Sequence, residues 1–294
     1  MKPSAEAFAG LSLRSARDRA AGMFVDAGIA DAASDATTLL CHAAGITRAG
    51  LIADGDAPLR PDQQKAYAAC VERRLAREPV TRIVGRRGFW DIELRVAPDV
   101  LDPRADTETL VAAALDIFAD RRREPLRILD LGCGSGAIIC ALLDQFTAAS
   151  GLAVDVSAAA CSLTQDNARL CGVASRLTVQ QQSWHSGISG QYDLVVSNPP
   201  YIRTGDLPAL DPEVWNWDPV LALDGGADGL DAYRDLLRLT VPALDPGGWL
   251  LLETGYDQGP DVTALLEVAG WRAIRAFRDL GGHVRVLAAR PPDK

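Results

Sequence analysis

The segment Asn198-Pro199-Pro200-Tyr201 combines a side chain and carbonyl groups that could bind a planar NH2 group. It directly follows an apolar run that ends at Ser197. Two successive prolines fix φ and remove two backbone donors, so we expect a stiff turn that presents carbonyl acceptors. An NH2 group could donate one hydrogen to the Asn198 side chain and the other to the Pro199 carbonyl. Tyr201 could stack on the planar group or face a cation.

Acceptors of this kind suit the transfer of a group to an amide or conjugated amine nitrogen. Such a nitrogen is a poor nucleophile because its lone pair is delocalised. Two acceptors would orient it and would favour the charge that develops on its N–H as the new bond forms, so no strong general base is needed before the attack. The competing interpretation is a proline-rich strand exit that only ends a sheet. The position after the fourth predicted strand favours a site.

A glycine loop over residues 129–136 closes a predicted strand and opens a helix. Its glycines allow a sharp turn and a close approach of a ligand to the backbone, and the spacing GxGxG differs from the GxGxxG of dinucleotide-binding proteins. Asp155 ends the next strand, 19 residues after Gly136. A carboxylate there can accept both ribose hydroxyls of a nucleoside. The alternative is a generic strand-to-helix turn with a surface Asp, but the combination favours a nucleoside cofactor over NAD.

The elements that must position these segments alternate between strand and helix from residue 107 onward. This alternation predicts an α/β fold with a doubly wound, mostly parallel seven-stranded sheet. The last two strands lie too close in sequence for a helical crossover, so we expect them to pair antiparallel. The expected strands cover 126–131, 152–156, 176–180, 192–197, 248–253, 271–277 and 283–288. The expected helices cover 107–120, 136–149, 157–171, 230–244 and 258–269.

Three segments of different character are expected along the chain: a small helical bundle over 1–85, a hairpin or linker over 86–106, and the α/β domain over 107–294. The hairpin or linker contains a strand-like alternation over 88–96 and a turn signal at 97–99. The bundle has apolar residues at helical spacing over 14–27, 31–44 and 61–77.

Composition excludes several classes of protein. The chain has 30 basic and 39 acidic residues and a formal net charge of -9. Residues 86–294 hold 19 of the basic and 29 of the acidic residues. An acidic surface repels phosphate backbones, which disfavours bulk nucleic-acid binding. No apolar run approaches the ~20 residues that span a bilayer, so we expect no membrane association.

The six cysteines and three histidines predict no metal site. The cysteines form no CxxC pair and fit no zinc spacing, and the histidines are scattered. We therefore expect reduced thiols, a cytoplasmic location and no bound metal.

On these motifs, the sequence resembles the S-adenosylmethionine-dependent methyltransferases. Within them, it is most similar to the peptide chain release factor glutamine N5-methyltransferases. The resemblance covers nearly the whole chain. Asn-Pro-Pro-Tyr alone also occurs in families similar to the adenine and guanine N-methyltransferases, so its companion motifs narrow the identification. The motifs are Pro79–Gly85, Phe89-Trp90, Leu101–Glu108, Asp130–Gly136, Asn198–Tyr201, Leu221–Leu230 and Leu250–Gly259.

The resemblance implies a class I methyltransferase sheet and a protein-(glutamine-N5) methyltransferase. Such an enzyme transfers a methyl group from S-adenosylmethionine to the side-chain amide nitrogen of the glutamine in the Gly-Gly-Gln motif of class I peptide chain release factors. It also implies site residues. Asn198, Pro199 and Tyr201 would be catalytic and, with Pro200, would receive the glutamine. The cofactor would be bound by Gly132, Cys133, Gly134, Ser135, Gly136, Asp155, Trp184 and Asn198.

The chain departs from the family pattern at two places. The family usually reads Ile-Pro-Arg-Pro-Glu-Thr-Glu where this chain has Asp102-Pro103-Arg104-Ala105-Asp106-Thr107-Glu108. The family also commonly has an acid just before the tryptophan that flanks the adenine, and this chain has Ser183 there. We expect a weaker or water-mediated contact to the adenine amino group.

Alternative functions share much of this pattern. A related enzyme could methylate a glutamine of a ribosomal protein or an exocyclic amine of a nucleic acid, or the chain could be a catalytically silent binding protein on a methyltransferase fold. We expect no direct sequence-specific nucleic-acid binding and a monomer. A set of arginines could form a solvated face or help dock the release factor: Arg73, Arg74, Arg77, Arg82, Arg86 and Arg87.

Overall fold

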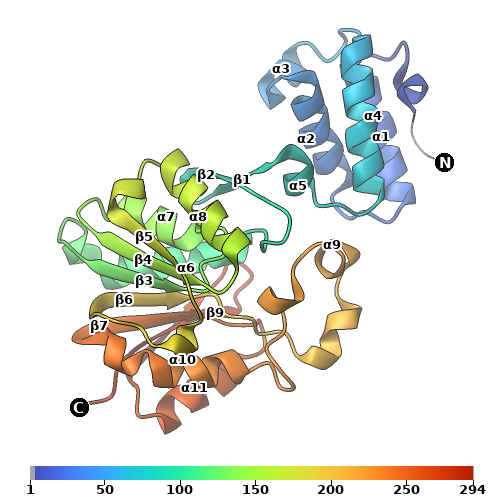
Figure 1. The fold of residues 1–294 in the computed structure, drawn as a ribbon. Helices are drawn as coiled ribbons and strands as arrows, with labels where there is room; N and C mark the ends of the chain where they lie inside the picture. The colour runs from blue at the N-terminus through green and yellow to red at the C-terminus, as the bar shows by residue number, and fades with distance from the viewer. Residues whose placement is uncertain (1–3, 294) are drawn as a thin grey trace. The chain divides into compact units, whose positions relative to one another are not determined.

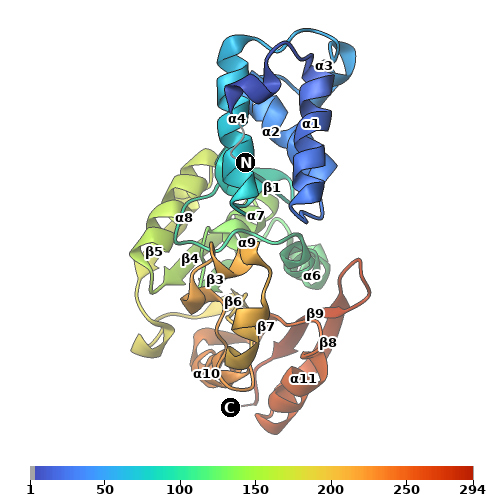
Figure 2. The same ribbon diagram turned by 90° about the vertical axis from the view of Figure 1, so that its right-hand side faces the viewer.

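The computed structural model describes residues 4–293. The chain divides into two compact units, Met1–Gly85 and Arg86–Lys294, which appear as the blue to cyan helices and the α/β body in Figures 1 and 2. None of the helices between residues 4 and 293 is both long and apolar enough to cross a membrane.

The first unit is a helical bundle, as the sequence predicts. Its core contains Phe8, Phe24, Leu39 and Tyr67, all fully buried. The Tyr67 hydroxyl donates to the Ala36 carbonyl at 3.0 Å, so this buried polar group is satisfied. Two short helices, α3 and α5, are additions to the expected set. The elements are η1 Ala5–Phe8, α1 Leu13–Asp26, α2 Ala32–Ala44, α3 Arg48–Ala53, α4 Pro61–Leu75 and α5 Val80–Val84.

The arginine set spans both units, and each member named here has a partner in its own unit; the interpretation as a solvated face is wrong for Arg74. Arg74 is buried and pairs with Asp35 at 2.8 Å. Other members bind acids or carbonyls of the same unit, which neutralises or occupies their guanidinium groups: Arg73 with Glu78, Arg77 with the Ala27 and Gly28 carbonyls, Arg86 with Glu93 and Arg87 with Asp102.

The second unit begins with a hairpin of β1 Arg86–Phe89 and β2 Ile92–Arg95. Its turn lies at Trp90-Asp91 and interrupts the strand-like alternation expected over 88–96, whereas a turn at residues 98–99 agrees with the turn signal at 97–99. Trp90 has φ 52°, a left-handed conformation that local sequence patterns rarely predict for a large side chain. The backbone N–H of Trp90 donates to the Glu108 carboxylate at 3.0 Å, which supports this conformation.

The remainder of this unit is a seven-stranded sheet in the order β5-β4-β3-β6-β7-β9-β8. Strands β3 to β7 pair parallel, and β9 pairs antiparallel with both β7 and β8, which confirms the predicted fold class. The strands are β3 Arg127–Leu131, β4 Ser150–Asp155, β5 Leu177–Gln181, β6 Tyr192–Ser197, β7 Leu244–Glu253, β8 Arg272–Arg278 and β9 Val284–Arg290.

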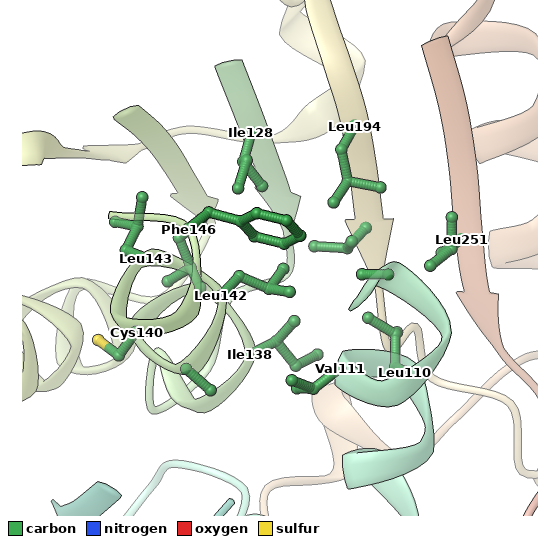
Figure 3. Packing of buried hydrophobic residues seen from close by; sticks show 14 of the residues in the cluster. Leu110, Val111, Ile128, Ile138, Cys140, Leu142, Leu143, Phe146, Leu194 and Leu251 are labelled. Carbon is green, nitrogen blue, oxygen red and sulfur yellow. The ribbon is translucent and has the colours of Figure 1, made fainter. Parts of the chain in front are cut away.

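Helices cover both faces of the sheet (Figure 1). Alternate strand residues face opposite sides, so Ile128, Leu194 and Leu251 pack against α6 and α7 (Figure 3). Their neighbours Leu129, Val195 and Leu250 pack in the opposite core with α10 and α11. The helices are α6 Glu108–Ile117, α7 Ala137–Gln145, α8 Ala158–Leu170, α10 Asp231–Leu239 and α11 Gly259–Val268.

Two local features differ from the expected elements. The helix expected over 230–244 ends at Leu239, because Pro242 cannot donate to a helix and the turn η8 Val241–Ala243 follows. Between β6 and α10 lies an irregular segment that the sequence pattern left undefined. It contains η6 Thr204–Ala209, α9 Pro212–Trp215 and η7 Val220–Ala222.

Candidate active site

A cavity of about 400 Å³ lies where β3, β4 and β6 end, which is the usual ligand edge of a parallel sheet. Segments distant in sequence form its walls: the chain after the hairpin, the glycine loop, the strand end at Asp155, the turn around Trp184, the corner after β6 and the irregular segment. The lining residues are Asp99, Val100, Leu101, Gly132, Gly134, Val154, Asp155, Val156, Ser157, Ala160, Gln182, Ser183, Trp184, His185, Asn198, Pro200, Pro219, Leu221, Ala222 and Asp224.

The glycine loop is held close to β4. The backbone N–H groups of Gly132 and Cys133 donate to the Val154 carbonyl at 2.8 and 3.1 Å. Gly136 has φ 77°, and a Cβ there would lie 2.8 Å from the Thr164 side chain, so no larger residue fits at the start of α7. The loop therefore presents backbone rather than side chains to the cavity.

Asp155 is fixed in the cavity wall by two backbone donors. The N–H of Gly134 donates to one carboxylate oxygen at 2.9 Å, and the N–H of Ser157 donates to the other at 2.8 Å. Each oxygen retains a further acceptor position. The carboxylate can therefore accept two hydroxyl groups without losing its own support.

Asp130 lies two residues before the first glycine and is completely buried. Neither carboxyl oxygen forms a hydrogen bond of good geometry within residues 4–293. Burial is the main cause that raises the pKa of Asp130 to about 8, and the charge of Asp155 adds to it. Asp130 does not belong to the residues that line the cavity, and the sequence analysis did not single it out.

Trp184 lies over the glycine loop, because a Cβ on Gly132 would be 3.4 Å from its ring. Its indole N–H donates to the His185 ring at 3.1 Å. His185 is exposed, and it also lines the cavity. Ser183, the position where the family commonly has an acid, accepts from the His185 N–H at 3.2 Å. It also lines the cavity.

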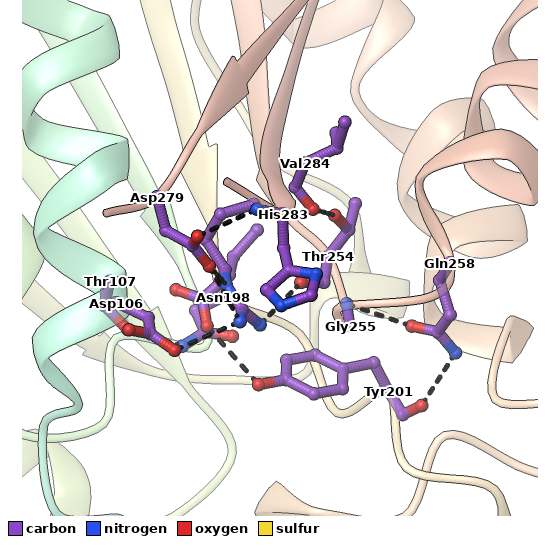
Figure 4. A network of polar contacts seen from close by, with 12 residues as sticks. Asp106, Thr107, Asn198, Tyr201, Thr254, Gly255, Gln258, Asp279, His283 and Val284 are labelled. Carbon is purple, nitrogen blue, oxygen red and sulfur yellow. Dashed lines mark hydrogen bonds and ion pairs between the residues drawn. The ribbon is translucent and has the colours of Figure 1, made fainter. Parts of the chain in front are cut away.

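The corner after β6 consists of residues 198–201, and it places Asn198 and Pro200 in the cavity wall. The side-chain NH2 of Asn198 donates to the Thr107 hydroxyl at 3.2 Å, so the Asn198 carbonyl oxygen stays available as an acceptor (Figure 4). Pro199 is buried behind this wall. The structure therefore brings the predicted acceptor to the same cavity as Asp155 and the glycine loop.

Tyr201 points away from the cavity wall. Its hydroxyl donates to Glu253 at 3.4 Å, and burial raises the pKa of this phenol above its ordinary value. Glu253 ends β7 and is buried, and burial raises its pKa to about 7 against the opposing effects of a Thr107 hydrogen bond and the Arg285 charge. The Arg285 guanidinium also pairs with Asp106 at 3.0 Å and Asp279 at 3.1 Å.

The backbone of the corner is clamped by two of the companion motifs. The Gln258 side chain donates to the carbonyls of Tyr201 at 2.9 Å and Gly229 at 3.2 Å (Figure 4). Gly225 packs so closely that a Cβ would lie 2.8 Å from the Tyr201 Cα and 2.9 Å from the Pro200 carbonyl oxygen. Through these contacts, the motifs over 221–230 and 250–259 hold the backbone of the corner in place.

Arg104 connects the segment before α6 to the irregular segment through an ion pair with Asp218, which is buried. Both segments line the cavity, through Val100 and Leu101 on one side and Leu221 on the other. The departure at Ala105 and Asp106 leaves this pair in place.

Six of the predicted site residues line the cavity: Gly132, Gly134, Asp155, Trp184, Asn198 and Pro200. The others support it from behind. The Cys133 thiol contacts Thr164, and the Ser135 carbonyl accepts from Asn167. Sequence analysis did not single out Asp130 or Glu253, although each lies within a quoted motif. No group of three metal-binding side chains occurs in the part of the chain that the structure describes.

Comparisons with known proteins agree with this geometry. Residues 15–85 match the family described as PrmC N-terminal domain, and residues 110–210 match the methyltransferase small domain. A protein named release factor glutamine methyltransferase from Rhodospirillum rubrum is 44% identical over 274 residues, which cover 93% of this chain and 83% of that protein. One with the same name from Cereibacter sphaeroides is 45% identical over 267 residues, covering 90% and 94%.

Among solved structures, the hMettl16 catalytic domain superposes with a TM-score of 0.54 at 14% identity and covers 68% of this chain and 76% of its own. At this identity the likeness concerns the fold alone. It agrees with the class I methyltransferase arrangement of the sheet.

Replacement of Gly225 by Ala should disrupt the corner. The added Cβ would meet backbone atoms that cannot rotate away, so we expect a loss of turnover of about tenfold or more with nearly unchanged cofactor affinity. Gly205→Ala is the matched control, because its Cβ would meet nothing within 4 Å. Equal turnover of the two variants would refute the clamp.

Asp130→Asn should remove a pH-dependent loss of stability. The folded-state pKa is raised from 3.8 to about 8, so between these values the unfolded chain loses the proton that the folded chain keeps, and the stability falls as the pH rises. We expect the Tm of the variant to exceed that of the unmodified chain increasingly between about pH 4 and about pH 8, with a constant difference above about pH 8. The exposed Asp120→Asn serves as the charge-matched control in calorimetry. Parallel curves for all three proteins would contradict the assignment.

Proposed function

The chain belongs to the release factor glutamine methyltransferase family, and we propose that it methylates the side-chain amide nitrogen of the glutamine in the Gly-Gly-Gln motif of class I peptide chain release factors. The observation that carries this proposal is the orientation of Asn198. Its NH2 is turned to Thr107, which leaves its carbonyl oxygen as an acceptor at the cavity wall. A primary carboxamide can donate to that oxygen.

The cofactor is S-adenosylmethionine, and the residues present fit it. Asp155 carries two acceptor oxygens for a ribose diol. The Trp184 ring provides a flat apolar surface for an adenine. Asp155 supplies negative charge at the cavity wall for a compound that carries a sulfonium and an ammonium group. The glycine loop leaves room for the methionine part, since no side chain projects from Gly132 or Gly134.

When bound, S-adenosylmethionine supplies a methyl group on a positively charged sulfur, which departs as the neutral thioether S-adenosylhomocysteine. The chain's own groups act on the glutamine. The Asn198 oxygen and the Pro199 carbonyl accept the two N–H hydrogens and hold the amide plane in one orientation. As the nitrogen becomes positive, these acceptors stabilise its N–H groups, and the surplus proton leaves to water after the bond has formed.

The entrance of the cavity carries apolar side chains that suit a peptide loop. Leu221 is 67% exposed and Val156 is 52% exposed, and both line the cavity. Covering them with a loop of the substrate would remove apolar surface from water and would keep water from the reacting nitrogen. Glycines next to the glutamine would let such a loop approach closely.

Other parts of the proposal rest on the chain as a whole. We assign the helical domain over 1–85 to recognition of the release factor, supported by its match to a family-specific domain. The acidic balance of residues 86–294 disfavours a nucleic-acid substrate. We also propose a monomer and a cytoplasmic location, and the free cysteines of the described residues agree with that location.

Asn198→Ala should lower turnover by about 100-fold or more, because it removes an acceptor that acts on the substrate nitrogen. The affinity for S-adenosylmethionine, measured by calorimetry, should change by less than about threefold. Normal turnover in this variant would remove the basis of the proposed role.

The substrate assignment is tested by incubating the full chain with intact release factor and isotopically labelled S-adenosylmethionine. Mass spectrometry should place one methyl group on the glutamine of the Gly-Gly-Gln motif. Parallel incubations with ribosomal proteins and with RNA act as controls. Label only in one of these controls would overturn the proposal in favour of the corresponding alternative.

A further inference from the structure

We propose that His185 is a positioning residue of the cofactor site. It fixes the Trp184 ring by accepting its indole N–H, and Asp235 competes with that ring for the same histidine nitrogen. The inference rests on the proposed function, because it assigns the Trp184 ring to the adenine of the cofactor. Trp184 and His185 belong to η5 Trp184–Ser186, which follows β5, and both line the cavity. Asp235 lies on α10.

The indole of Trp184 is held at two ends. Its six-membered ring lies over the glycine loop, where Cζ3 would be 3.4 Å from a Cβ on Gly132. At the other end of the indole, Nε1 lies 3.1 Å from Nε2 of His185. The side chain is half-buried and packs against the apolar core that contains Leu131 and Val154. The packing determines where the ring lies, and the directional hydrogen bond determines how it is rotated.

The backbone of this turn is closed, so the His185 ring is presented from a defined place. The Ser183 hydroxyl oxygen accepts from the His185 backbone N–H at 3.2 Å, and the Ser183 carbonyl accepts from the Ser186 N–H at 3.0 Å. A serine side chain at such a position satisfies an N–H group that the turn itself leaves unpaired. Ser183 therefore acts on the cofactor wall through His185.

The direction of the contact between the two rings follows from their chemistry. An indole N–H can only donate, so Nε2 of His185 must be the acceptor. A neutral imidazole has one acceptor nitrogen and one N–H, which places the hydrogen of His185 on Nδ1. In this form, the histidine nitrogen that faces Trp184 carries a lone pair and no hydrogen.

Asp235 offers the same nitrogen a second partner. Its Oδ2 lies 3.4 Å from Nε2 of His185, and a guanidinium nitrogen of Arg238 lies 3.5 Å from its Oδ1. A carboxylate only accepts, so it can bind Nε2 only when that nitrogen carries a hydrogen. Nε2 therefore either accepts from Trp184 or donates to Asp235, and it cannot do both. The first state holds the indole ring, and the second leaves the indole N–H to water.

The expected effect on cofactor binding is moderate. The side chain of His185 is 53% exposed and that of Asp235 is 37% exposed, so water competes for each contact. One hydrogen bond of this kind changes an equilibrium by about threefold to tenfold. A ring that is free to rotate must be ordered when the adenine stacks on it, and this ordering weakens the cofactor complex.

The first test compares His185→Leu with His185→Gln. Leucine removes the acceptor, so the Kd of S-adenosylhomocysteine, measured by calorimetry, should rise by about threefold to tenfold. The glutamine side chain can place its carbonyl oxygen near the position of Nε2, so its Kd should stay within about twofold of that of the unmodified chain. Equal Kd values for the two variants, whether normal or raised, would overturn the inference.

Two further variants serve as controls. His42→Leu replaces an exposed histidine of the helical unit and should leave the Kd unchanged. Asp235→Ala removes the competing acceptor, so its Kd should be unchanged or lower. The double variant with His185→Leu should have the Kd of His185→Leu alone, because Asp235 acts only through His185. A Kd in Asp235→Ala that rises as far as in His185→Leu would refute the competition.

One measurement is independent of turnover and of the cofactor. The Trp184 indole N–H resonance, assigned with Trp184→Phe, should shift in His185→Leu and exchange with solvent at least about threefold faster than in the unmodified chain. His185→Gln should restore slow exchange. If the unmodified chain fails to methylate release factor but the exchange and Kd differences are present, the proposed function fails and the inference stands. If methylation is normal and the resonance is the same in all three proteins, only the inference fails.

Discussion

The corner after β6 must hold one carboxamide side chain in one orientation, and much of the surrounding structure serves this requirement. The corner cannot be secured by its own backbone donors, because two prolines have removed them. Support therefore comes from elsewhere: Gln258 binds the Tyr201 carbonyl, and Gly225 lets a second segment pack against the turn. The rigidity of the site is a property of three segments that meet, rather than of the motif alone.

The same requirement explains why acids are buried in this domain. Asp130 and Glu253 are both withdrawn from water, and burial raises the pKa of each. A fold selected for stability alone would place apolar residues there. Asp130 lies two residues before Gly132 and Glu253 accepts from Tyr201 at the corner, so both acids adjoin the walls of the site. Part of the free energy of folding is thus given up to shape the site.

The sequence predicted the sheet and the order of its elements along the chain, because apolar runs and glycine spacing are local signals. The family resemblance implied that Asn198, Asp155 and the glycine loop share a cofactor site, and in the structure they line one cavity where the carboxyl ends of parallel strands lie. It could not predict the turn at Trp90, where a contact with Glu108 supports an unusual φ. Nor could it show that Tyr201 turns to Glu253, because that partner lies on another strand and carries no periodic signal.

The Asp155 carboxylate is held in one orientation before any ligand binds. Two N–H groups of its own domain hold both carboxylate oxygens. The rotamer of this side chain is therefore chosen during folding, and little conformational entropy is left to lose when a diol docks. A ligand should bind to Asp155 with little rearrangement of this side chain. Because its two acceptor oxygens are fixed, a nucleoside that lacks one ribose hydroxyl should bind more weakly.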